Sequence, residues 1–230
     1  EDVKFHNGEP FTSESVKFTL DRVVNPDTKS PQASVWTSYD TVDTSDPYVA
    51  LIKTKEPMGT MLTNLALTAM LPPEAGKTLD FATEAIGTGP FKFVEWKLDD
   101  HLTLEANEEY WGDVPKIKTV IIRDIPEATT RASALETGEV DFLWGVTPEE
   151  RERLDSLPDI SVIDYPTYTV RFLWLNAGRE PFTKPEVRDA VRYALDYEGY
   201  QLLWGGVQPG TNLAVGLSGA LGPDEALKRD

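Results

Sequence analysis

The chain has 230 residues, with 39 acidic and 22 basic side chains and a formal net charge of −17. Apolar residues make up 40% of it, aromatic residues 10%, and cysteine is absent. The apolar content excludes a disordered chain, and the lack of cysteine excludes disulfides and thiolate metal sites. A nucleic-acid partner is not expected, because no basic stripe is present to neutralise phosphates.

The first third of the chain is predicted to hold two helices and a strand. Apolar residues recur every three or four positions between 16 and 24, which predicts a helix over residues 12–25 with Thr12 as its cap. Residues 48–54 alternate between apolar and polar side chains and predict a strand. Residues 61–71 predict a buried helix, ended by a pair of prolines.

Strands are expected from residue 87 onward. Residues 90–96 and 102–106 predict a hairpin. The nearly continuous β-branched run at 117–122 is typical of a strand covered on both faces. Three further short strands are predicted at 140–144, 160–163 and 169–175.

The second half of the chain also carries signals for helix starts. A proline at the beginning and a glycine at the end predict a helix over 126–138. Capping boxes at 147–150 and 183–186 predict two more helices. The uncharged stretch 199–223 contains many glycines and two prolines, so it predicts a loop and not a membrane span. Strands and helices together indicate a mixed α/β chain.

No catalytic or metal-binding motif stands out, so we predict no cofactor and no metal. The two histidines, His6 and His101, are too few for the usual zinc clusters, and His6 is expected to be structural or exposed. Asp40, Asp43 and Asp46 lack the alternate spacing and central glycine of a calcium loop and predict an acidic surface loop. Paired carboxylates of a glycosidase remain open, since 39 acidic residues offer many pairs.

Six tryptophans are the unusual feature of the composition. Most are expected in the core, because large aromatic rings bury much apolar surface. Trp36, in a predicted loop, and Trp174, on a predicted strand, are the candidates for lining a ligand cleft. A core position is the alternative for both.

A series of short segments shares its order and spacing with one protein family. The segments are VKFHNGEPFT at 3–12, SVKF at 15–18, SPQAS at 30–34, GTGPFKF at 87–93, LEAN at 104–107, YWG at 110–112, the stretch 131–141, LN at 175–176, and PEVRDA at 185–190 with ALD at 194–196. Together they resemble family 5 of the extracellular solute-binding proteins, the peptide- and nickel-binding components of ABC importers.

The resemblance implies an α/β chain with the type II periplasmic-binding-protein fold, in which two lobes close on a ligand. It implies that this fold is incomplete here. Residues 1–68 resemble the extra subdomain of lobe one, 69–168 its central part, and 169–230 the hinge crossing and the beginning of lobe two. We therefore expect a piece of a longer protein that, when isolated, self-associates or is marginally stable.

The implied function is the capture of an oligopeptide-like ligand and its delivery to an ABC transporter permease in the membrane, without catalysis. The implied location is periplasmic or extracellular, with a lipid anchor on a preceding N-terminal segment as an open alternative. A nickel chelate, an oligosaccharide or haem remains open as the ligand. A carboxylate-dependent glycosidase and the ligand-sensing module of a regulator are the alternative functions.

The resemblance also suggests which residues contact the ligand. Gln32 lies in a segment that resembles a ligand-facing loop of the family. Arg171, Phe172 and Trp174 lie on the segment that resembles the hinge strand beside the ligand, and Asn176 lies at its end. Ordinary packing or solvent exposure is the alternative for each of them.

Overall fold

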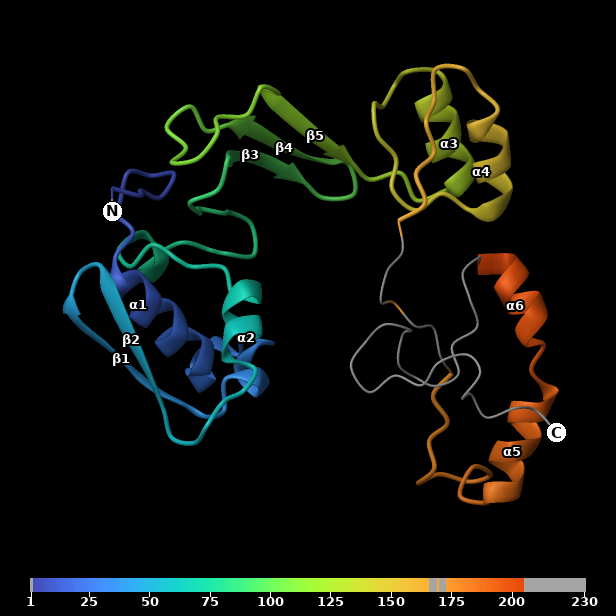
Figure 1. The fold of residues 1–230 in the computed structure, drawn as a ribbon, viewed down its shortest axis with the longest axis horizontal. Helices are drawn as coiled ribbons and strands as arrows, with labels where there is room; N and C mark the ends of the chain where they lie inside the picture. The colour runs from blue at the N-terminus through green and yellow to red at the C-terminus, as the bar shows by residue number, and fades with distance from the viewer. Residues whose placement is uncertain (1, 166–168, 170–172, 205–230) are drawn as a thin grey trace. The chain divides into compact units, whose positions relative to one another are not determined.

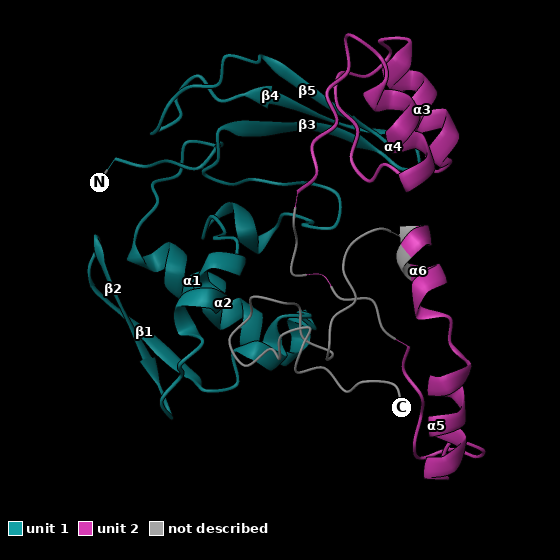
Figure 2. Cartoon of the chain, turned by 45° about the vertical axis from the view of Figure 1, so that its right-hand side comes forward, with its two compact units in different colours: residues 1–124 teal, residues 125–230 magenta. Residues whose placement is uncertain are grey.

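The computed structural model describes residues 2–165, 169 and 173–204. The chain forms two compact units, Glu1–Asp124 (unit 1) and Ile125–Asp230 (unit 2), which are coloured separately in Figure 2. The predicted boundaries near residues 68 and 168 follow family subdomains and remain predictions. Within the described residues, no helix is long and apolar enough to cross a membrane.

The first part of unit 1 packs helix α1 (Ser13–Val24) against an antiparallel hairpin of β1 (Tyr39–Asp46) and β2 (Val49–Thr54) (Figure 1). The predicted helix and the predicted strand at 48–54 are confirmed. Each large apolar side chain buried here contributes about 1.5–3 kcal/mol. The buried apolar residues of this core are Leu20, Val23, Trp36, Tyr39 and Val42.

Helix α2 (Met61–Leu67) corrects the prediction of a longer, buried helix over 61–71. None of its residues is buried, and Leu62 is 81% exposed, because only one side of the helix packs against the core. The helix ends at Thr68, whose hydroxyl donates to the Asn64 carbonyl (2.7 Å), several residues before the prolines. Two short 3-10 helices, Pro26–Thr28 and Ala33–Val35, lie between α1 and β1. A third, Ala75–Lys77, follows α2.

The acidic loop predicted around Asp40, Asp43 and Asp46 is wrong, because these residues belong to strand β1. In the same strand, Tyr39 and Val42 reach the core, and pairing with β2 holds the segment extended. The aspartates are exposed or half-buried, so the expectation of a surface position holds although that of a loop does not.

The second part of unit 1 is a sheet of strands β3 (Phe91–Lys97), β4 (His101–Ala106) and β5 (Thr119–Arg123), antiparallel in the order β3-β4-β5. The predicted hairpin is confirmed. The prediction that residues 117–122 are covered on both faces is wrong for this chain. Ile121 is 60% exposed and Ile122 54%. Since neighbouring strand residues point to opposite faces, neither face of β5 is covered by the described part of the chain.

The regular elements in the described part of unit 2 are the helices α3 (Ala128–Glu136), α4 (Pro148–Asp155), α5 (Pro185–Ala194) and α6 (Tyr197–Trp204), joined by irregular segments. Helices α3 and α4 contact each other, and Ala132, Ala134 and Leu154 are buried there. Helix α6 shows that the predicted loop over 199–223 is wrong up to residue 204. The remainder of that stretch lies outside the described residues.

The two predicted capping boxes have different outcomes. Thr147 caps α4, because its hydroxyl accepts a hydrogen bond from the Glu150 backbone (3.3 Å). The box at 183–186 is wrong: the cap of α5 is Lys184, and the Thr183 hydroxyl donates to the Glu180 carboxylate instead (2.6 Å). The first residue of α5 is a proline, which has no backbone N–H, so no hydrogen-bond acceptor is needed at that position.

The short strands predicted after β5 are not found. Residues 140–144 and 160–163 are irregular, with no ladder partner in the described part of the chain. Of the predicted strand 169–175, residues 170–172 lie outside the described residues and the rest is irregular. An isolated β-branched run forms a strand only where another strand pairs with it.

Candidate functional site

The loop 30–36, which contains the predicted ligand-facing segment 30–34 and Trp36, is attached to helix α2 by two side-chain hydrogen bonds. The Gln32 amide donates to the Leu67 carbonyl (2.9 Å), and the Asn64 amide donates to the Val35 carbonyl (2.9 Å). Gln32 is half-buried, and its own backbone donates to the Ser30 hydroxyl (3.3 Å). These bonds fix both the loop and the direction of the Gln32 side chain.

An open depression of about 410 Å³ lies between this loop and the start of α2. Hydroxyl and amide groups offer donors and acceptors without net charge, which suits neutral polar groups such as a peptide main chain. The lining residues are Ser34, Val35, Thr37, Ser38, Pro57, Met58, Gly59, Thr60 and Asn64.

Trp36 is a core residue and not an exposed ligand contact. Its side chain is fully buried, and its ring meets Tyr39 edge-on with centroids 6.5 Å apart. The indole Nε1 donates to the Thr68 hydroxyl (3.2 Å), so its polar atom is also satisfied inside the protein. Of the two roles considered for Trp36, the structure has the core position, and contact with a ligand would require that core to open.

The remaining predicted site residues belong to unit 2. Trp174 has 82% of its surface exposed, and Asn176 is exposed with its side-chain oxygen accepting from the Gly178 backbone (3.0 Å). Arg171 and Phe172 lie outside the described residues. The structure thus brings Gln32 and Trp36 together on one loop of unit 1, and Trp174 and Asn176 on one segment of unit 2.

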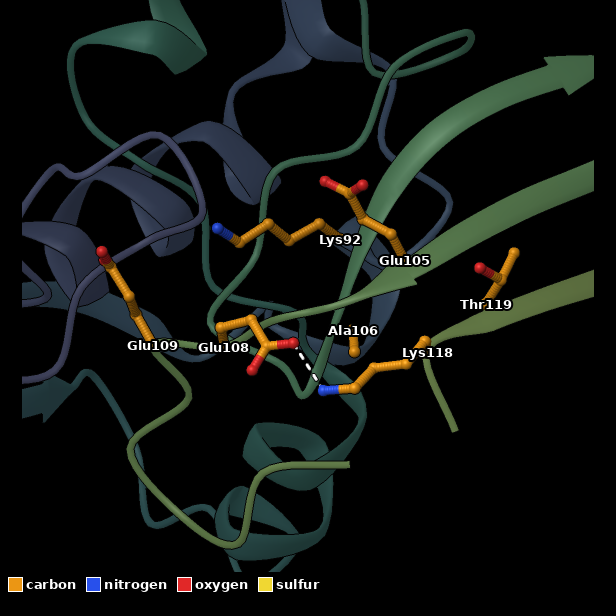
Figure 3. Close-up of a pocket in the computed structure, with 7 residues that line it drawn as sticks. All are labelled: Lys92, Glu105, Ala106, Glu108, Glu109, Lys118 and Thr119. Carbon is orange, nitrogen blue, oxygen red and sulfur yellow. Dashed lines mark hydrogen bonds and ion pairs between the residues drawn. The ribbon is translucent and has the colours of Figure 1, made fainter. Parts of the chain in front are cut away.

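A second depression, of about 450 Å³, lies on the three-stranded sheet (Figure 3), and neither depression is lined by any of the six predicted contact residues. Lys92 and Glu105 are cross-strand partners on β3 and β4, and Lys118 pairs with Glu108 at 2.6 Å. Such opposite charges in solvent largely neutralise each other and give little binding energy. We assign no ligand to it. It is lined by Lys92, Glu105, Ala106, Glu108, Glu109, Lys118 and Thr119.

His6 has a more specific role than its sequence neighbourhood indicates. Its Nε2 donates to the Gly89 carbonyl (3.0 Å), and its Nδ1 accepts from the Gly87 backbone N–H (3.3 Å). These partners are 83 and 81 residues away in the chain. His6 is therefore structural, which was one of the two expectations, but it holds a specific distant turn.

Two further side chains hold the same turn at residues 87–89. The Asn107 amide donates to the Gly89 carbonyl (3.3 Å), and the Trp111 Nε1 donates to the Thr88 carbonyl (3.0 Å). The signal that could have found this cluster was the resemblance itself. His6, the turn, Asn107 and Trp111 each come from one of the segments shared with the family.

The other histidine has a different electrostatic environment. His101 lies at the start of β4, with Asp100 at 3.2 Å and Glu95 at 3.3 Å. Hydrogen bonds to Asp100 and to Glu95 raise the pKa of His101 above its ordinary value. Across the part of the chain that the structure describes, no group of three or more histidine or acidic side chains could hold a metal ion.

The family model for bacterial extracellular solute-binding proteins, family 5 (Middle), matches residues 1–226. The chain belongs to this family. Family 5 consists of solute-binding proteins and not of enzymes, so it gives no support to a carboxylate-dependent glycosidase.

Named relatives agree with this assignment. The glutathione-binding protein GsiB of Pectobacterium atrosepticum is 32% identical over 201 residues, which cover 84% of this chain and 39% of the relative. The structure resembles NikZ of Campylobacter jejuni in complex with Ni(L-His), with a TM-score of 0.79 at 26% identity, covering 87% of this chain and 41% of that one. It also resembles the oligopeptide-binding protein AppA of Bacillus subtilis in complex with a nonapeptide, with a TM-score of 0.77 at 28% identity, covering 87% and 42%.

The same relatives show how much of the fold is present. The family 5 chain described here is a mixed α/β part of the type II periplasmic-binding-protein fold. It spans about two-fifths of the length of the curated relatives that it matches.

Proposed function

We propose that this family 5 chain is part of an extracytoplasmic binding protein that captures short peptides or peptide-like solutes for an ABC importer. The observation that carries the proposal is the family match over residues 1–226. Among the relatives, GsiB is named for glutathione, itself a tripeptide, and AppA was solved with a nonapeptide. The partner is a membrane permease, and the protein acts in the periplasm or outside the cell, with a lipid anchor as one means of retention.

The chemistry of the two units supports a peptide ligand. The depression beside the loop 30–36 offers hydroxyl and amide groups, which match the N–H and C=O groups of a peptide main chain. The exposed indole of Trp174 adds a flat apolar surface. Gln32, Arg171, Phe172, Trp174 and Asn176 are the proposed contacts. A ligand that touches both lobes stabilises the closed state and shifts the population toward it.

Calorimetric titration of the full-length protein tests the ligand class. We expect glutathione or peptides of a few residues to bind with a Kd of micromolar order, about −8 kcal/mol. Nickel–histidine and an oligosaccharide serve as the competing ligands. Mass spectrometry should recover the bound peptide intact. Binding of nickel–histidine or sugar without any peptide binding would contradict the proposed class.

Paired variants test the proposed contacts. Trp174→Ala should weaken peptide binding about tenfold, the equivalent of roughly 1.4 kcal/mol. Trp144→Ala is the matched control, because Trp144 is also in unit 2 and is 76% exposed. Phe172→Ala and its control Phe142→Ala form a second pair. If target and control variants change the Kd equally, the site assignment is wrong while the ligand class stands.

A further inference from the structure

Both ring nitrogens of His6 are used by the turn at residues 87–89. Nε2 faces a carbonyl, that of Gly89 at 3.0 Å, so it must carry a proton and donate. Nδ1 faces the Gly87 backbone N–H at 3.3 Å, so it must be bare and accept. Only the neutral imidazole with its proton on Nε2 satisfies both partners.

The turn held by His6 connects two parts of unit 1. His6 lies on the N-terminal turn, and its backbone N–H also donates to the Gly87 carbonyl (2.9 Å). On the other side, residue 90 leads directly into Phe91, the first residue of β3. Since Asn107 and Trp111 hold the turn from the sheet side, His6 is the side chain that holds it from the N-terminal side.

We propose that His6 is a pH-sensitive clasp, whose Nδ1 holds the Gly87 N–H of the turn 87–89 only while the imidazole is neutral. Protonation places a second N–H on Nδ1, facing the Gly87 N–H, so one hydrogen bond is lost and two donors oppose each other. Histidine takes up its proton within the range of about pH 5 to 8. A second proton leaves the Nε2 bond to Gly89 and the backbone bond to Gly87 in place, so the Nδ1 bond is the contact that is lost at low pH.

Among the described residues, no carboxylate forms an ion pair with His6, so none is in place as a counter-ion to a protonated imidazole. Glu9, on the same turn, uses its carboxylate oxygens for the backbone N–H groups of Glu74 and Ala75 (2.9 Å each). Other titratable groups on the segments that meet His6 are Lys4, two residues before it, Glu84 before the turn, and Glu108, Glu109 and Tyr110 beyond Asn107. Of these, Glu108 pairs with Lys118.

Hydrogen exchange of the full-length protein, measured by mass spectrometry on a peptide spanning residues 84–92, tests the clasp. After correction for the intrinsic pH dependence of exchange, we expect protection in this peptide to fall about five- to tenfold between about pH 7.5 and about pH 5. His6→Gln is the decisive variant, because glutamine offers one donor and one acceptor with a similar separation but does not titrate. Its protection should be independent of pH.

Two further variants complete the test. His6→Ala should have low protection at every pH, because both side-chain bonds are lost. His101→Gln removes the other histidine of the 230-residue sequence and should keep the wild-type pH profile. Corrected protection that does not change with pH in the wild type would overturn the proposal, and so would a pH dependence that persists in His6→Gln. Neither outcome bears on the proposed ligand, because no ligand is present in the measurement.

Discussion

At the level of single residues, the Glu9 carboxylate joins parts of the chain that are far apart in sequence. Its two oxygens accept from the backbone N–H groups of Glu74 and Ala75, and Asn7 donates to it as well (2.6 Å). Partial burial acts to raise the pKa of Glu9, but the hydrogen bonds from Glu74, Ala75 and Asn7 outweigh it and lower that pKa below its ordinary value. The folded state therefore favours the ionised carboxylate.

Replacing Glu9 by glutamine should lower the free energy of unfolding by about 1 kcal/mol at neutral pH, because one of the backbone donors loses its charged acceptor. A depressed pKa stabilises the fold above the pKa of the unfolded chain, and this contribution is lost as the pH falls through the folded value. The difference between wild type and variant should thus shrink on acidification. Urea unfolding at several pH values measures it.

The control for this prediction is Glu56→Gln, which removes an exposed carboxylate from a loop of the same unit. It should leave the stability nearly unchanged at every pH. Equal effects of the two substitutions would mean that general charge, and not the Glu9 hydrogen bonds, determines the result. Such a result would count against the role given to Glu9.

At the level of elements, the two threonines of the predicted capping boxes form a natural comparison. Their sequence patterns are alike, with proline and an acidic residue following in each. Only Thr147 accepts a backbone hydrogen bond from its helix, whereas Thr183 donates to the Glu180 carboxylate at the surface. A capping hydroxyl accepts from a backbone N–H that has no acceptor within the helix. A surface hydroxyl forms a hydrogen bond that water could form in its place.

Thr147→Ala should therefore destabilise α4 by about 1 kcal/mol. Thr183→Ala should destabilise α5 by only a few tenths of a kcal/mol, since a surface contact of this kind is weak. Hydrogen exchange in peptides covering Pro148–Asp155 and Pro185–Ala194 measures the two effects separately. A larger loss of protection in α5 than in α4 would show that the assignment of the caps is reversed.

At the level of the whole molecule, many large apolar side chains are exposed in both units. Trp96, Ile121 and Ile122 are exposed on the sheet of unit 1, and Phe142, Trp144 and Ile163 in unit 2. Exposed apolar surface of this kind promotes association. The net charge of −17 opposes it through repulsion between copies, which salt screens.

The 230-residue chain produced by itself should therefore self-associate, and more strongly at high salt than at low salt. Size-exclusion chromatography with light scattering, over a range of concentrations, measures this directly. The full-length protein is the control and should form assemblies with fewer copies under the same conditions. A monomeric chain at high salt and high concentration, with a cooperative melt, would contradict the prediction.

Features that depend on neighbours in the chain were predictable. The apolar period of α1 and the β3–β4 hairpin each depend on residues close in sequence, so local patterns determine them. The order of the motif segments likewise indicated family 5, and the family match over residues 1–226 confirmed it. What the sequence by itself determined is therefore the family and most of the helices.

Features that depend on distant partners required the tertiary structure. Trp36 is a core residue because Tyr39 and Thr68 contact its ring and its Nε1, and the side chains of β5 are exposed because no described segment covers its faces. His6 acquires its role from a turn more than 80 residues away. Burial and hydrogen-bond partners arise from contacts between remote segments, and a local pattern carries no information about which segments meet.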